Sequence, residues 1–364
     1  MMESKEFMVA GTTLARRFWE ARIQLKTIQP LLFVFLMSTL FFPFLRVSSL
    51  RNDNYQLVSS SGTVDYPLPP IDYPPLTVVG RLWSDDSYWY KKIPQNAPLH
   101  PDSEKMVEWL INTDGHNDGH PVIHYKAWTK PVYEAYQDTP THNVYYQDGT
   151  RVMFTNVRIP LDAQPATDLD GGLTIIDWYG EKVWDFWQLA YQNGKWTAGD
   201  GYGYDLYSDG IAPNRVWTCG GSSTPMLGIL IRPEEIEAGV INHPLGCCLH
   251  TPKKGEKVYP PAATTDGKSN DMYAIPEGAR IQLDPNLDLD SLSLSRTTKI
   301  IAKCMQEYGI VVKESGGSWG LYAEHTYTAD WSAWGLTGGI LMSLPAQWRI
   351  VDYSVFGAVE EEYP

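Results

Sequence analysis

The feature that most constrains this chain is an almost wholly apolar run, residues 28–45. A basic flank precedes the run and contains Arg16, Arg17, Arg22 and Lys26. This order is typical of an export signal or a membrane anchor. A spanning helix needs about 20 apolar residues and the apolar core of a signal peptide about 7 to 15, so the length is compatible with both. We expect residues 1–49 to be a cytoplasmic basic flank plus a signal peptide or anchor helix. The rest of the chain would be extracytoplasmic, either secreted or anchored to the membrane by residues 28–45.

A stretch rich in proline and serine, residues 50–78, follows the apolar run. Proline fixes the backbone φ angle and donates no backbone hydrogen bond, so this stretch predicts an extended, semi-rigid linker. The remaining residues, 79–364, are predicted to form a single β-rich exported domain.

The composition favours β-structure and narrows the classes of partner. The 30 Gly, 26 Pro, 14 Trp and 22 Tyr of the chain are typical of all-β proteins with many turns. A formal net charge of −14 makes nucleic acid an unsuitable partner, because binding it depends on Lys and Arg that neutralise phosphates. The same charge disfavours polyanionic glycans unless a local basic cleft or a bound cation offsets it.

Short runs of β-branched and aromatic residues recur from residue 121 onward. They predict strands at 122–128, 143–146, 151–159, 173–177, 182–190, 227–231, 247–250, 310–314 and 319–323. Hairpin turns are predicted at Trp178-Tyr179-Gly180, Asp148-Gly149 and Asn193-Gly194.

Three segments predict helices: 104–111 after a Ser103 cap, a short helix from Pro233 that Gly239 ends, and 295–308. The fold class is therefore mainly β, with a β-sandwich or jelly-roll-like domain that carries a few short helices.

The four cysteines do not form a dense disulfide framework. In an exported protein, a disulfide from Cys219 to Cys247 or Cys248 is expected. Cys304 falls in a helical pattern and is predicted to be a buried apolar residue.

The densest group of candidate site residues is the hairpin at 168–196. Asp177, Glu181 and Asp185 are candidate catalytic carboxylates, because glycoside hydrolysis uses one carboxyl group as an acid and another as nucleophile or base. Trp187 and Trp196 are candidate platforms on which a sugar ring would stack. The alternative is a core hairpin with a solvated acidic rim.

Two further groups suggest metal ligands. His116, His120 and His124 are spaced by four residues, but the adjacent glycines and proline oppose the helix that would align them. Three aspartates suggest a calcium loop, and turn formation explains their spacing equally well; they are Asp284, Asp288 and Asp290. No cofactor is required by the sequence, and Ca²⁺ is the cation that it suggests.

Four stretches carry a resemblance to a known family: DGGLTIIDWYGEKVWDFWQ (170–188), GILIRPEEIEAGVINHPL (228–245), AIPEGARIQLDPNLDLDSL (274–292) and IIAKCMQEYGIVVKESGG (300–317). Their sequences resemble those of a family of uncharacterised exported bacterial proteins, many of them actinobacterial. The resemblance implies a secreted β-rich domain, with these candidate site positions: Asp170, Trp187, Gln188, Arg232 and His243. This chain departs from the expected pattern at Gly172, where we would expect His.

These observations predict an exported protein that acts on, or binds, a neutral or weakly charged polysaccharide or cell-surface glycan. The expected mechanism is hydrolysis through paired carboxylates, with His243 as a further catalytic candidate. A polysaccharide lyase is the second enzymatic prediction, in which Gln188 and Arg232 would neutralise a uronate. The alternative from another class is a non-catalytic structural or assembly protein of the cell surface.

Overall fold

The computed structural model describes residues 82–114, 119–213, 216–255 and 258–356. All of them belong to one compact unit, Asp72–Pro364. The predicted signal or anchor and the predicted linker lie outside the described residues. None of the helices in the described part of the chain has the length and apolar character needed to cross a bilayer.

Short strands and a few helices make up this part of the chain. The helices are α2 (Ser103–Asp114), α3 (Pro233–Ala238) and α4 (Arg296–Glu307), with 3-10 turns η1 (Tyr88–Tyr90), η2 (Met226–Gly228), η3 (Ser332–Trp334), η4 (Ile340–Ser343) and η5 (Tyr353–Phe356). The strands are β1 (Val122–His124), β2 (Val132–Ala135), β3 (Thr141–Tyr146), β4 (Val152–Arg158), β5 (Leu173–Asp177), β6 (Lys182–Trp187), β7 (Ala190–Gln192), β8 (Lys195–Ala198), β9 (Asp200–Asp205), β10 (Leu245–Leu249), β11 (Arg280–Leu283), β12 (Ile310–Ser315), β13 (Gly320–Tyr322) and β14 (Trp348–Ile350).

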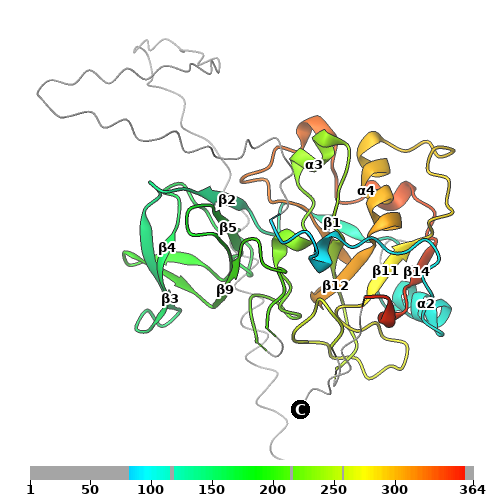
Figure 1. Cartoon of the computed structure of the whole chain (residues 1–364), viewed down its shortest axis with the longest axis horizontal. Helices are drawn as coiled ribbons and strands as arrows, with labels where there is room; N and C mark the ends of the chain where they lie inside the picture. Colours follow the sequence, from blue (N-terminus) through cyan, green and yellow to red (C-terminus); the bar gives the residue numbers. More distant parts are fainter. Residues whose placement is uncertain (1–81, 115–118, 214–215, 256–257, 357–364) are drawn as a thin grey trace, which may run out of the picture. The chain divides into compact units, whose positions relative to one another are not determined.

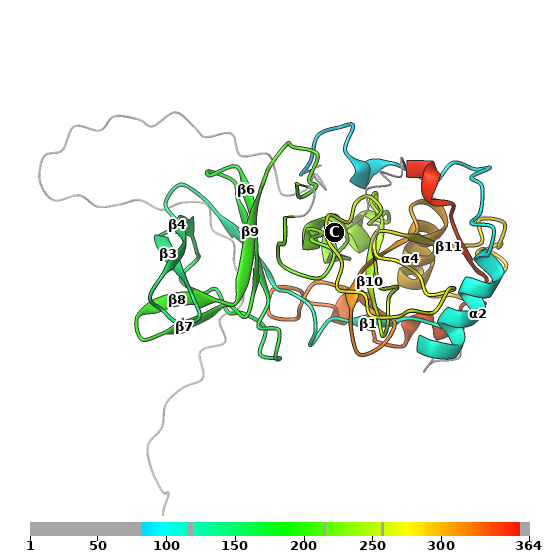
Figure 2. The ribbon, with the colours of Figure 1, turned by 90° about the horizontal axis from the view of Figure 1, so that it is seen from below.

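The strands form three sheets, each with both parallel and antiparallel pairs. One has six strands in the order β1-β13-β10-β12-β11-β14, and the other two have four each, β2-β5-β6-β9 and β4-β3-β8-β7. In Figures 1 and 2 the two four-stranded sheets lie beside each other, and the strands of the six-stranded sheet lie with α2 and α4. The mainly β class predicted from the sequence is confirmed, whereas these strand orders do not show a jelly roll.

The two four-stranded sheets share an apolar core. Trp184 and Phe186 of β6 pack in this core with Val144 of β3 and Trp196 of β8. The opposite face of β6 contributes Val183 to a second core. Because successive side chains of a strand point to opposite faces, β6 can fill both cores at once.

The six-stranded sheet is covered by helix α4. Ser295 caps the helix, since its hydroxyl accepts a hydrogen bond from the amide of Thr298 at 3.0 Å. Ile301 and Met305 are fully buried and belong to the same core as Leu245 and Ile310 of the sheet. Residues spaced by four lie on one face of a helix, so the predicted apolar stripe is the face that packs.

Most predicted elements are present with shifted ends. The three hairpin turns join β5 to β6, β3 to β4 and β7 to β8, each as an antiparallel pair. The strand predicted at 227–231 is wrong: its first residues form η2, and only Ile231 pairs, as an isolated bridge to Ala323. The expected disulfide is also not formed, because all four cysteines are free thiols and all are buried. Cys304 is buried as predicted.

We expect Ile301→Ala to lower the free energy of unfolding by about 2–5 kcal/mol, because it opens a cavity between α4 and the sheet. The matched control is Lys303→Ala on the same helix, whose side chain is exposed and pairs with Glu307. It should cost about 0.5 kcal/mol or less. Urea unfolding followed by circular dichroism measures both, and equal losses would contradict the packing described for this helix.

Candidate functional site

A cleft of about 650 Å³ lies where strands of the four-stranded sheet β2-β5-β6-β9 approach the six-stranded sheet. One wall comes from the segments before β5, at the end of β6 and at the start of β9. The other comes from β1, β10, β12 and β13. The lining side chains include His124, Trp128, Lys130, Asp170, Trp187, Asp200, Trp217, Cys219, Cys248, Asp266, Lys313, Glu314 and Tyr322.

Three tryptophans of the cleft expose much of their indole rings. Trp128, Trp187 and Trp217 are 46%, 38% and 50% exposed, although large aromatic side chains are usually buried. The ring of Trp187 lies against Gly199, where an added Cβ would come within 2.8 Å of Cε3. A larger residue at this position would therefore displace the indole.

A buried group beneath the cleft surrounds Lys130. Its Nζ donates to Sγ of Cys219 at 2.9 Å and lies 3.6 Å from Oδ1 of Asp185. Burial alone would lower the pKa of Lys130, but the Asp185 carboxylate raises it above its usual value. The lysine stem packs on Gly172, because an added Cβ there would lie 2.8 Å from Cγ of Lys130. The expected histidine at position 172 would collide with this stem.

A second buried ion pair lines the opposite wall. Nζ of Lys313 lies 2.6 Å from Oε2 of Glu314, and the hydroxyl of Tyr322 donates to Oε1 at 2.6 Å. Burial alone would raise the pKa of Glu314, but Lys313 and the Tyr322 hydroxyl more than offset it, so the pKa is lowered. Glu314 is therefore held as a carboxylate.

Two aspartates of the cleft have raised pKa values, in contrast to Glu314. Burial raises the pKa of Asp170, and the charges of Glu314 and Asp168 add to the shift. Burial likewise raises the pKa of Asp200. The indole N–H of Trp187 donates to Oδ1 of Asp170 at 3.2 Å. The cleft thus holds carboxyl groups whose pKa values are displaced in opposite directions, which is common at catalytic sites.

The thiols of the cleft are not activated. Burial raises the pKa of Cys219 to about 11 and that of Cys248 to about 12, even though Lys130 lies beside the first. A thiolate is the reactive form of cysteine, so both side chains are inert thiols at neutral pH.

Two candidate positions from the sequence, Asp170 and Trp187, line the cleft. Asp185 lies beneath it, fully buried, and accepts hydrogen bonds from Thr174 and from the amide of Met226. These bonds tie β6 to β5 and to the start of η2, so Asp185 holds the floor of the cleft in place.

The other hairpin candidates lie away from the cleft lining. Asp177 accepts a hydrogen bond from the amide of Gly180 at 2.7 Å and so fixes the turn. Glu181 is exposed in that turn, with φ of 52°. Gln188 donates to the carbonyl of Leu169 at 3.3 Å. Trp196 is buried against Tyr191, with ring centroids 5.2 Å apart.

Arg232 and His243 form a separate buried network around α3. Nε of Arg232 donates to Glu324 at 3.0 Å. Nε2 of His243 lies 2.9 Å from Glu235, and Nδ1 lies 2.8 Å from the carbonyl of Pro244. Both ring nitrogens face oxygen acceptors, so only the doubly protonated imidazolium donates to both. Burial alone would lower the pKa of His243, but Glu235 raises it overall.

The predicted metal ligands serve as turn and surface residues. Asp284 and Asp288 accept hydrogen bonds from the amides of Asn286 and Asp290, and Asp290 pairs with Lys299 at 3.1 Å. Within the described ranges, no group of three or more His, Cys, Asp or Glu side chains is arranged to hold a metal ion. Of the spaced histidines, His116 lies outside those ranges and His124 lines the cleft alone.

Sequence reasoning missed most of the cleft. The missed residues are Trp128, Lys130, Asp200, Trp217, Lys313, Glu314 and Tyr322. Lys313 was the one detectable signal, since a lysine within an otherwise apolar strand predicts a buried charge with a partner. No protein-family model, curated protein or solved structure matches this chain at significant similarity.

We expect the buried pair of His243 and Glu235 to make stability depend on pH. The folded-state pKa of His243 is raised above 6.5, so the contribution is complete below pH 6.5 and is lost as the pH rises through the folded-state value. His243→Gln should therefore cost most at low pH, about 3–5 kcal/mol. Chemical unfolding of both proteins across a pH series measures the difference, and a cost that grows with pH would contradict the assignment.

Proposed function

We propose that this chain is an exported carbohydrate-active protein that binds a polysaccharide or cell-surface glycan in the cleft and hydrolyses it. The observation that carries the proposal is the group of three exposed indoles around a cleft lined with carboxyl groups. Aromatic faces stack on the apolar face of a sugar ring, and carboxylates accept hydrogen bonds from its hydroxyls. The apolar run at 28–45 supports export, by secretion or anchoring, and the resemblance to exported bacterial proteins agrees with it.

Two cleft residues suit the chemistry of glycoside hydrolysis, which needs a proton donor and an ionised carboxylate. Asp170 has a raised pKa and would protonate the leaving oxygen. Glu314, with a lowered pKa, would act as the nucleophile or as the base that activates water. Since the charge of Glu314 helps to raise the pKa of Asp170, ionisation of one favours protonation of the other.

Other chemistries fit the cleft less well. A lyase would need a base and a group that neutralises a uronate, but Gln188 and Arg232 are not among the residues that line the cleft. The pKa of Tyr322 is raised well above its usual value by burial, which disfavours its use as a base. Ca²⁺ is not needed for the proposed hydrolysis.

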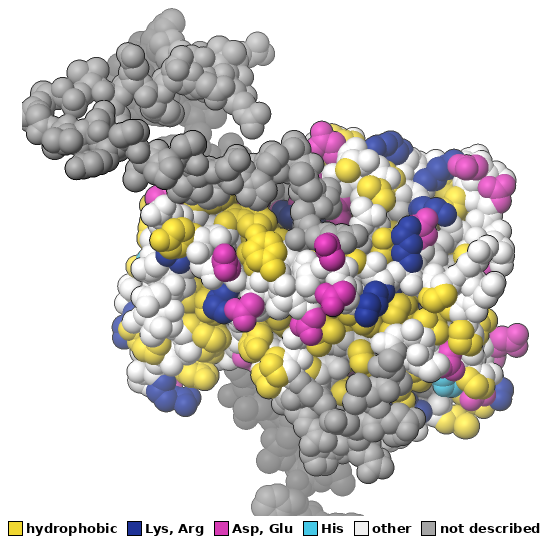
Figure 3. Space-filling model, in the orientation of Figure 1, with side chains coloured by type: hydrophobic (Ala, Val, Ile, Leu, Met, Phe, Trp, Pro, Cys, Tyr) yellow, Lys and Arg dark blue, Asp and Glu magenta, His cyan; other side chains and the backbone are white. Residues whose placement is uncertain are grey.

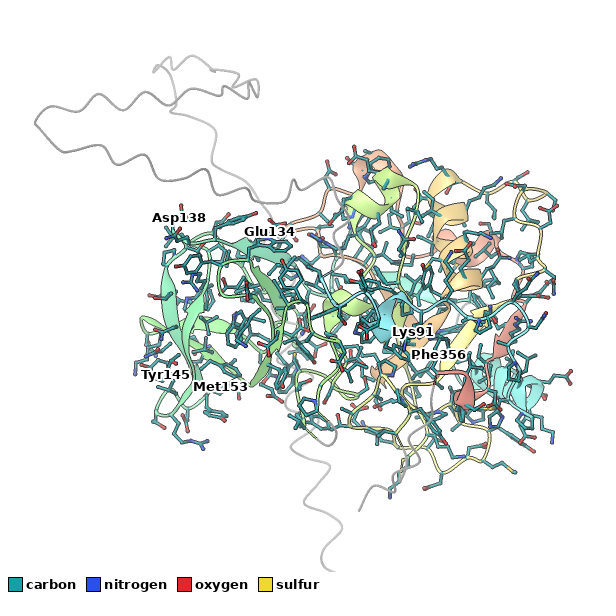
Figure 4. The ribbon with its side chains drawn as sticks, in the orientation of Figure 1. Lys91, Glu134, Asp138, Tyr145, Met153 and Phe356 are labelled. Atoms are coloured by element: carbon teal, nitrogen blue, oxygen red, sulfur yellow. The ribbon has the colours of Figure 1, made fainter. Side chains whose placement is uncertain are left out.

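We expect Asp170→Asn and Glu314→Gln each to lower kcat about 100- to 10,000-fold, because each removes one of the two groups that act on the bond. A screen of polysaccharides for new reducing ends identifies the substrate and measures the loss. Asp138→Asn is the matched control, since Asp138 is an exposed turn residue after β2, labelled in Figure 4. Unchanged turnover in both cleft variants would refute the roles given to Asp170 and Glu314, and binding without products would make the protein a lectin-like module.

The rate should fall as the pH drops through the lowered pKa of Glu314 and as it rises through the raised pKa of Asp170. Tyr322→Phe removes the hydroxyl that donates to Glu314, so the acidic limb of the pH–rate profile should move to higher pH. The alkaline limb should stay where it is. A Tyr322→Phe profile with an unmoved acidic limb would show that Glu314 is not the titrating group.

The tryptophans give a test that is independent of turnover. Trp187→Ala should weaken glycan binding about 3- to 10-fold through loss of stacking. Tyr207→Ala serves as the control, because Tyr207 is 58% exposed and is not part of the cleft lining. Isothermal titration calorimetry with a bound glycan measures both. If a glycan array shows no ligand at all, the non-catalytic structural role replaces this proposal.

A further inference from the structure

The two lysines of the cleft are each balanced by a carboxylate. Lys130 lies 3.6 Å from Asp185, and Lys313 lies 2.6 Å from Glu314. In contrast, no ion pair in the described ranges joins Asp170 or Asp200 to a Lys or Arg, although Lys313 and Lys130 act on them from farther away. The carboxyl groups that line the cleft outnumber its lysines, so the cleft favours a cationic ligand over an anionic one.

The formal net charge of the whole chain is also negative, −14. On the face that Figure 3 shows, acidic and basic side chains are interspersed with apolar ones. Asp200 is half-buried, and a charge at a half-buried group is screened less than one on the outer surface. The ligand's own charge therefore matters most at the unpaired carboxyl groups.

Asp200 lies near two exposed indoles, those of Trp187 and Trp217. It begins β9 and pairs across the sheet with Trp187 of β6, whose ring packs on the adjacent Gly199. The side chain of Trp217 lies close enough to lower the pKa of Asp200. Oδ1 of Asp200 also accepts from the amide of Gly201 at 2.7 Å, which fixes the carboxyl group. Burial raises the pKa of Asp200 and outweighs the amide of Gly201 and the charge of Lys130, which lower it.

We propose that Asp200, with Trp187 and Trp217, forms a subsite for the ammonium group of an amino sugar, so that the cleft selects glycans with free amino groups. The inference rests on the proposed function and names its substrate class. A cation is attracted both to a carboxylate and to the face of an indole, and both interactions strengthen when water is excluded. Acetylation of the amine removes the charge and leaves Asp200 unpaired, which is what makes such a subsite selective.

Titration calorimetry on the full chain tests the subsite with three oligosaccharides of equal length and linkage, built from glucosamine, N-acetylglucosamine or glucose. The wild-type protein should bind the glucosamine oligomer about tenfold more tightly than the other two. Asp200→Asn should bring the three affinities close together, because the neutral amide can still accept the hydrogen bond of Gly201 but carries no charge. Asp138→Asn, the exposed control, should keep the full preference.

The outcomes separate the inference from the proposed function. If the wild-type protein binds the acetylated or neutral oligomer as tightly as the amine, the subsite is overturned and the carbohydrate proposal stands. The same holds if Asp200→Asn keeps the preference. If no oligosaccharide and no glycan of an array binds, both are overturned. The wild-type comparison decides the matter even if the Asp200 variant fails to fold.

Discussion

Asp185 is the group on which the cleft depends. Its carboxylate lies at zero exposure in β6, accepts hydrogen bonds from Thr174 of β5 and from the amide of Met226, and lies 3.6 Å from Nζ of Lys130. A buried carboxylate is very costly unless it is paired and fully hydrogen-bonded. These partners come from three distant parts of the chain, so meeting the requirement brings them together. The floor of the cleft follows from this convergence.

On the wall formed by β12 and β13, neutralisation of charge also decides the state of the carboxyl groups, but it is uneven. Lys313 and the Tyr322 hydroxyl stabilise the ionised form of Glu314, while Asp170 receives only the indole N–H of Trp187 in compensation. Unequal compensation of carboxyl groups that share one cleft is how a protein assigns acid and base roles at a single pH. Asp200 is held by the amide of Gly201 and forms no ion pair with a Lys or Arg of the described residues, so it suits a cationic part of a ligand.

Local chemistry made much of the fold predictable. Asn193-Gly194 and Asp148-Gly149 set hairpin turns because both pairs tolerate positive φ, and Gly149 and Gly194 have φ values of 66° and 76°. The cap at Ser295 and the stripe through Ile301 defined α4. The prediction failed at Leu227, where an apolar run forms a 3-10 turn in the core, since burial and not strand pairing accounts for its hydrophobicity.

The sequence by itself determined the strand-rich class, the hairpin turns and the presence of the three helices, because these depend on contacts between near neighbours. It also marked Asp170 and Trp187 as candidate site positions. Only the tertiary structure decided that Asp185 is a buried support, that Asp177 fixes a turn, and that Glu314 and Asp200 face the same space. Burial and charge pairing set these roles, and both arise between residues far apart in the chain. The sequence alone therefore does not distinguish a carboxylate that supports the fold from one that fixes a turn or binds a ligand.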